Sequence, residues 1–152
     1  MTLPLSEIDA PAFGRSLTGM GVNLLVRDVN ATAQFFADVF GCHIHRVDQN
    51  YAIIGYGDQL MQLHQDATYH SNPLPSLMPE AGPRGGGVEL HFFETDPDEA
   101  VQRARTLDCV VLQEPTDKPH GLREAYILSP DGYCCIASRR LTPTPNDSDY
   151  SV

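Results

Sequence analysis

Some stretches of the chain show the hydrophobic pattern of a strand and others that of a helix. The same order of these stretches occurs twice. The first block, residues 19–65, begins with the apolar run GMGVNLLV, which is typical of a strand. Residues 35–40 then place apolar side chains at helical spacing. We expect this helix to start with Asp28 or Asn30 as its N-cap and to end at Gly41. Three further runs, CHIHRV, YAIIGY and QLMQLHQ, predict strands.

The second block, residues 86–139, repeats this order. It begins with the strand-like run GVELHFFE, and Asp96 followed by Pro97 predicts a helix start after it. The runs CVVLQEP, REAYILS and YCCIASR then predict three strands. Each block therefore reads βαβββ, and the repeat predicts an α+β fold of two tandem modules. A helix covers one face of each module's sheet, so the other face needs a partner, which the second copy provides.

The repeat also sets the expected domain organisation. The connection between the modules is long and irregular, with four prolines and four glycines in the stretch ATYHSNPLPSLMPEAGPRGGG, and such connections are often functional. The two ends of the chain show no clear period. We therefore expect an N-terminal extension, one domain containing both modules and their linker, and a flexible C-terminal tail: residues 1–18, 19–140 (linker 66–85) and 141–152.

Composition and charge restrict the partners of this chain. Twenty acidic against ten basic residues give the 152-residue chain a net charge of −10, which opposes binding to nucleic acid. No apolar run approaches the roughly 18–20 residues of a membrane span, and the first 17 residues contain no apolar signal core. The four cysteines contain no CxxC pair, so we expect reduced thiols. These features predict a cytoplasmic protein with neither nucleic acid nor membrane as a partner.

Short motifs within the two blocks resemble those of one family. Residues 26–28 (VRD), 33–36 (AQFF) and 39–41 (VFG) are similar to the first strand–helix signature of the vicinal oxygen chelate superfamily of glyoxalases, bleomycin-resistance proteins and extradiol dioxygenases. Residues 129–133 (SPDGY) resemble its DPDGY turn, with serine for the first aspartate, and residues 121–127 (GLREAYI) resemble the strand before it. The resemblance implies a cupped mixed sheet around a pocket, and a homodimer. Exposed sheet edges in each module also favour pairing.

The resemblance further implies where a metal would bind. Catalytic members hold one metal with histidine or glutamate from the first and last strand of each module, and these positions correspond to Gly21, Gln62, Glu89 and Ile136. Glycine and isoleucine offer no side-chain donor, whereas a divalent metal needs at least three. We therefore expect no metal or other cofactor. An alternative is a displaced divalent metal site formed by His64, Glu89 and His91.

Polar residues two apart on a strand share a face, as Gln62 and His64 do in one block and Glu89 and His91 in the other. If the strand face of each block that carries these residues lines the cup, their side chains meet there and form hydrogen bonds to a ligand, to water or to each other. The expected ligand-binding residues are Asn23, Gln62, His64, Glu89, His91 and Tyr126. We expect a protein that binds a small organic molecule in the cup between its modules. The alternative is a metal-dependent lyase, isomerase or dioxygenase of the same superfamily, for which no catalytic residue stands out.

Overall fold

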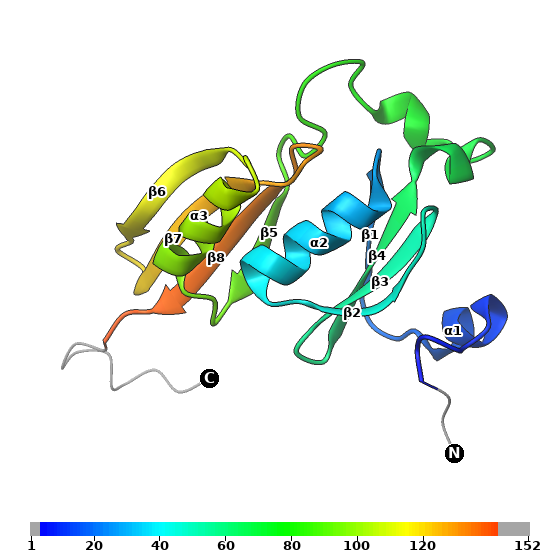
Figure 1. Cartoon of the computed structure of the whole chain (residues 1–152), viewed down its shortest axis with the longest axis horizontal. Helices are drawn as coiled ribbons and strands as arrows, with labels where there is room; N and C mark the ends of the chain where they lie inside the picture. The colour runs from blue at the N-terminus through cyan, green and yellow to red at the C-terminus, as the bar shows by residue number, and fades with distance from the viewer. Residues whose placement is uncertain (1–3, 143–152) are drawn as a thin grey trace. The chain divides into compact units, whose positions relative to one another are not determined.

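The computed structural model describes residues 4–142, which divide between Arg84 and Gly85 into two compact units (Figure 1). The first unit contains α1 (Ala10–Ser16), β1 (Val22–Val26), α2 (Val29–Phe40), β2 (His43–Val47), β3 (Tyr51–Tyr56) and β4 (Gln59–Gln65). Two short 3-10 helices follow, η1 (Asp66–Tyr69) and η2 (Leu74–Leu77). The second unit contains β5 (Glu89–Phe93), α3 (Pro97–Thr106), β6 (Val111–Asp117), β7 (Leu122–Leu128) and β8 (Cys134–Arg140). The predicted pair of βαβββ modules is confirmed.

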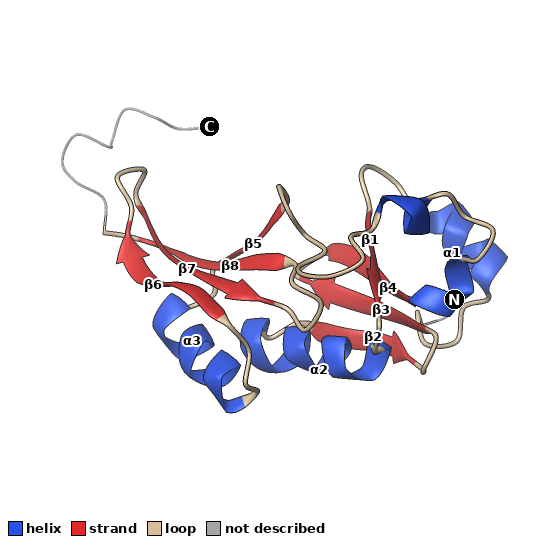
Figure 2. Cartoon of the chain, turned by 90° about the horizontal axis from the view of Figure 1, so that it is seen from above, coloured by secondary structure: helices blue, strands red, loops and turns tan. Residues whose placement is uncertain are grey.

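The first module forms a four-stranded sheet in the order β1-β4-β3-β2. The central strands β4 and β3 are antiparallel, whereas β1 runs parallel to β4 and places Asn23 beside Gln62. Side chains alternate between the two faces of a strand. Leu24, Ala52 and Leu63 point to the face that α2 covers, and each is at most 6% exposed (Figure 2). The core of this module therefore lies between α2 and one face of its sheet.

Helix α2 has the predicted ends and the predicted buried stripe. Oδ1 of Asp28 accepts a hydrogen bond from the backbone N–H of Ala31 at 2.9 Å, so Asp28 is the N-cap. The helix ends where Gly41 takes up the left-handed conformation with φ of 67°. Phe35 and Phe36 are almost completely buried, with their ring centroids 5.2 Å apart in an edge-to-face arrangement. These residues fix α2 to the sheet.

The second module repeats this plan, with strand order β5-β8-β7-β6 and β5 parallel to β8. Asp96 is the N-cap of α3, and its Oδ1 accepts hydrogen bonds from the backbone N–H groups of the first turn. Arg123 of β7 donates two hydrogen bonds to the carboxylate of Asp98 on α3, at 2.8 and 2.9 Å. This bidentate pair lowers the pKa of Asp98 and connects α3 to its sheet.

Three further observations concern the helices, the cysteines and the end of the chain. None of the helices between residues 4 and 142 is long and apolar enough to cross a membrane. All four cysteines are free thiols, and burial raises the pKa of Cys42 to about 12. The flexible tail predicted for residues 141–152 lies, from residue 143 onward, outside the described residues.

Candidate functional site

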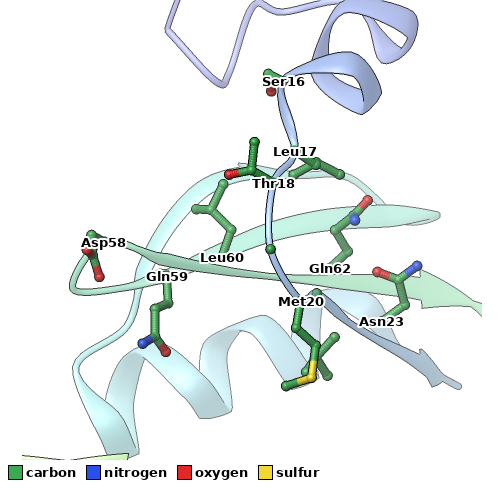
Figure 3. A pocket seen from close by; sticks show the side chains of 12 residues that line it. Ser16, Leu17, Thr18, Met20, Asn23, Asp58, Gln59, Leu60 and Gln62 are labelled. Carbon is green, nitrogen blue, oxygen red and sulfur yellow. The ribbon is translucent and has the colours of Figure 1, made fainter.

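The N-terminal extension forms a helix on the sheet of the first module, where the sequence pattern predicted no regular element. Helix α1 begins with Asp9 as its N-cap, whose Oδ1 accepts a hydrogen bond from the backbone N–H of Ala12 at 2.7 Å. Its Phe13 is only 5% exposed. Figure 3 shows the end of α1 and α2 on opposite sides of the sheet. We call the face of this sheet opposite α2 the α1 face; it carries Asn23, Tyr51, Ile53, Gln62 and His64.

A cavity of about 350 Å³ lies between α1 and the α1 face. Apolar residues from the N-terminal segment form one wall of this cavity, and residues of β3 and β4 form the other. The first wall contains Ile8, Phe13 and Leu17, and the second contains Tyr51, Ile53, Gln62 and His64. Ile53 is 1% exposed although it lies on the face away from α2, because the N-terminal segment covers it.

A second, larger cavity of about 810 Å³ adjoins the first where residues 16–23 pass β4. Figure 3 shows Leu60 and Gln62 on the same side of β4, facing the segment that carries Leu17 and Thr18. Asn23 also lines this cavity. Gln62 belongs to both cavities, so its amide group lies where the two meet.

Two tyrosines hold the polar side chains Gln62 and His64 of the smaller cavity in place. The hydroxyl of Tyr51 donates a hydrogen bond to Oε1 of Gln62 at 2.8 Å. The ring of His64 lies against both Tyr51 and Tyr69, with each pair of ring centroids 5.0 Å apart. Nε2 of His64 is buried and makes no hydrogen bond with any residue that the structure describes. Burial lowers the pKa of His64, so the imidazole is neutral at neutral pH.

The structure brings three of the six predicted site residues together on the first module. Asn23 and Gln62 are register partners on adjacent strands, and Gln62 and His64 line one cavity. We missed Phe13 and Tyr51, which line the same cavity. Asp9 and the following Pro11 are typical of a helix start and could have indicated α1.

The other three predicted residues belong to the second module. Oε2 of Glu89 and Nε2 of His91 are 3.1 Å apart on β5, and both side chains are partly exposed. Tyr126 lies on β7 beneath Lys118, whose Nζ is 5.2 Å from the centre of the ring. Burial first, and then the carboxylates of Glu124 and Glu89, raise the pKa of Tyr126. A pocket shared by the two sets of residues remains a prediction.

The side chains of the first module do not fit the metal site that the resemblance implies. The resemblance pairs Gly21 with Gln62 and Glu89 with Ile136. In the structure, the neighbour of Gln62 on the adjacent strand is Asn23, and the neighbour of Glu89 is Cys134. Two neutral amides are weak ligands for a transition metal. Within residues 4–142, no group of three or more histidines, cysteines, aspartates or glutamates could hold a metal ion. Burial and the neighbouring Glu89 also raise the pKa of Cys134, which disfavours its thiolate.

Comparisons with known proteins agree with this architecture. Residues 21–134 match the sequence model of the Glyoxalase/Bleomycin resistance protein/Dioxygenase superfamily. None of the curated proteins compared with the chain matches it.

Solved structures share the fold at low sequence identity. A family enzyme from Burkholderia phytofirmans PsJN is 18% identical with a TM-score of 0.67, over 80% of this chain and 97% of that one. A hypothetical protein from S. aureus is 23% identical with a TM-score of 0.64, over 86% of this chain and 98% of that one. A lactoylglutathione lyase from Agrobacterium tumefaciens is 22% identical with a TM-score of 0.56, over 80% of this chain and 92% of that one.

Proposed function

Because the chain belongs to the glyoxalase/bleomycin resistance protein/dioxygenase superfamily, we propose that it binds a small organic molecule on the α1 face of its first module, without an obligatory metal. The observation that carries the proposal is the 350 Å³ cavity, in which Tyr51, Gln62 and His64 converge within mostly apolar walls. Ligand sites in proteins have volumes of roughly 300–1,000 Å³ and combine apolar walls with a few oriented polar groups.

Three of the predicted binding residues take distinct roles in this proposal. Gln62 presents its amide nitrogen to the ligand, because the hydrogen bond from Tyr51 to its oxygen fixes the orientation of the amide group. His64 offers Nε2, and a hydrogen bond from the ligand to this atom offsets the cost of burying it, about 1–3 kcal/mol. Asn23 lines the adjoining larger cavity, where a longer ligand extends.

A neutral fluorescent dye, phenylnaphthylamine, tests the proposal. The chain contains no tryptophan, so Phe13→Trp introduces a single indole at the cavity wall. We expect saturable binding of one dye per chain and energy transfer from the introduced indole to the dye. The dye's affinity for the wild-type chain is the reference for the variants that follow.

Gly14 permits a cavity-filling variant. It lines the cavity, and a Cβ at this position meets nothing within 4 Å, so the side chain of Gly14→Leu can start into the free volume and reduce it. Arg15→Leu, on the same helix but outside the cavity lining, is the matched control. We expect Gly14→Leu to weaken dye binding and Arg15→Leu to leave it unchanged. Equal affinities in both variants, or no saturable binding to the wild type, would overturn the proposal.

A further inference from the structure

The cavity beneath α1 is lined by a basic residue, although the protein as a whole is acidic. The chain has twenty acidic and ten basic residues, yet the lining of this cavity includes Arg46 and no aspartate or glutamate. Arg46 is half-buried, and its guanidinium group lies 5.8 Å from the centre of the Tyr51 ring. It forms no ion pair with any carboxylate in residues 4–142. The cavity therefore holds a positive charge that the described protein does not neutralise by direct contact.

An irregularity in β2 places Arg46 in the cavity. Ile44 pairs with Ile54 on β3, but Arg46 pairs with Ile53, so β2 contains a bulge between these two positions. In a regular strand Arg46 and Ile44 would both point to the α2 face. The bulge instead turns Arg46 to the α1 face, opposite Ile53, which lines the same cavity.

The nearest acidic residue along the strand has other partners. Asp48 lies two residues after Arg46, in the turn between β2 and β3. Its Oδ1 accepts hydrogen bonds from the backbone N–H groups of Asn50 and Tyr51, at 2.8 and 3.0 Å. This carboxylate stabilises the turn, so the guanidinium of Arg46 is available to a ligand.

The rest of the cavity suits a flat apolar group. Phe13 comes from the helix and Ile53 from the sheet, so apolar walls stand on both sides. Tyr51 adds an aromatic ring that its hydrogen bond to Gln62 holds in one orientation. Aromatic rings pack well against such walls because they bury a large apolar area and lose little conformational freedom.

We propose that the cavity binds an aromatic anion, such as an aryl carboxylate or sulfonate, with its anionic group on Arg46 and its ring between Phe13 and Ile53. Arginine matches the planar, bidentate geometry of a carboxylate better than any other side chain. Nε2 of His64 then forms a hydrogen bond to a polar substituent on the ring. The inference rests on the proposed function and adds the chemical class of the ligand.

Two dyes with the same ring system separate the charge of the ligand from its apolar part. Anilinonaphthalene sulfonate is anionic, and phenylnaphthylamine is its neutral counterpart. Each is titrated into the wild type, Arg46→Gln and Arg103→Gln. Arg103 lies on α3 and lines none of the described cavities around α1, so its substitution changes the net charge equally without touching the site. Circular dichroism confirms that all three proteins are folded.

We expect Arg46→Gln to weaken binding of the sulfonate about tenfold, the usual loss for one charge-assisted hydrogen bond. Binding of the neutral dye to Arg46→Gln, and of both dyes to Arg103→Gln, should stay within about twofold of the wild type. Naphthoate should displace the sulfonate at a concentration about tenfold lower than naphthylmethanol does.

The outcomes separate the two proposals. Equal sulfonate affinity in the wild type and Arg46→Gln, or an equal loss for both dyes, overturns the anionic ligand class. The small-molecule site itself stands in that case, provided that Gly14→Leu still weakens the neutral dye. Failure of both dyes to bind the wild type overturns both proposals.

Discussion

The hydroxyl of Tyr51 hydrogen-bonds to Oε1 of Gln62 across two antiparallel strands, although the register partner of Tyr51 is His64. Gln62 is its diagonal neighbour, and diagonal pairs on one face are within reach of long aromatic side chains. The ring of Tyr51 thus contacts His64 while its hydroxyl orients Gln62. One tyrosine therefore orients two of the polar side chains that the proposed ligand meets, Gln62 and His64.

Removing this hydroxyl should cost stability even though the ring remains. We expect Tyr51→Phe to lower the free energy of unfolding by about 1 kcal/mol, the usual net contribution of one hydrogen bond. Tyr69→Phe is the control, since Tyr69 contacts His64 through its ring and has no hydroxyl hydrogen bond among the described residues. Urea unfolding measures both. A loss in Tyr69→Phe as large as that in Tyr51→Phe would contradict the assigned role of the Tyr51–Gln62 bond.

The connecting segment is fixed to the first module by an ion pair. Arg84, whose side chain is 6% exposed, donates to both carboxylate oxygens of Asp66 at 2.7 Å and to the backbone oxygen of Leu25 at 3.2 Å. Asp66→Asn removes the negative charge from these two hydrogen bonds and should destabilise the protein by about 2–3 kcal/mol, as expected for hydrogen bonds between charged groups. Glu80→Gln, an exposed change in the same segment, should have almost no effect. Similar denaturant midpoints for both variants would count against the role of this pair.

The stability of the protein should fall at mildly acidic pH. Burial lowers the pKa of His64, and burial with the nearby His43 lowers that of His45. The unfolded chain therefore binds protons more strongly than the folded protein below the ordinary histidine pKa of about 6.5. The contribution of these residues is complete above that pH and is lost as the pH falls toward their folded values.

Unfolding free energies between about pH 7 and 5 test this expectation. His64→Gln should reduce the slope, leaving the part that comes from His45. Ser71→Ala, an exposed change in the connecting segment that involves no titratable group, should keep the slope of the wild type. An unchanged slope in His64→Gln would show that His64 does not titrate in this way.

Local sequence signals predicted most of the elements. The caps at Asp28 and Asp96 and the stop at Gly41 lie where the pattern placed them, because caps depend on residues within one turn of the helix. The pairing of Asn23 with Gln62 could not be read in the same way. It joins two parallel strands that are far apart in the sequence, β1 before α2 and β4 after β3, so no turn sets their register as it does in a hairpin.

The residues that shape the cavity were the hardest to predict. Phe13 belongs to a helix of seven residues, which is too short for a hydrophobic period to stand out. Arg46 reaches the cavity only because of the bulge in β2, and alternation alone assigns it to the other face. Both depend on tertiary contacts of the first module, which the local pattern does not contain.

We expect the protein to form a homodimer that buries at least about 1,600 Å² in total. Strand β6 is an edge of the second sheet, and its Leu112 is 61% exposed, which favours pairing through this edge. Light scattering at micromolar concentration should give twice the mass of the chain. Leu112→Lys should shift the protein toward the monomer, whereas Gln102→Lys, an exposed change on α3, should not. A monomeric wild type would contradict the dimer, and an unaffected dimer in Leu112→Lys would exclude this edge.

We also expect the purified protein to contain far less than one transition-metal ion per chain. Asn23 and Gln62 provide two neutral amides at the paired positions of the first module, and such donors hold zinc, nickel or iron weakly. A metal that binds only the folded state raises the melting temperature, so its removal lowers it. Treatment with a chelator should therefore change the melting temperature by less than about 1 °C. Elemental analysis of the same sample gives the metal content directly.

A stoichiometric metal would reverse this expectation and favour the enzyme alternative. The displaced site consists of His64, Glu89 and His91, so His64→Ala and His91→Ala should each then remove the metal while the protein stays folded. His70→Ala, outside this set, is the control and should retain it. Loss of metal in both test variants but not in the control would assign the metal to the displaced site. Such a site would supply the Lewis acid that the amide pair lacks, and a lyase, isomerase or dioxygenase would become the better proposal than a binding protein.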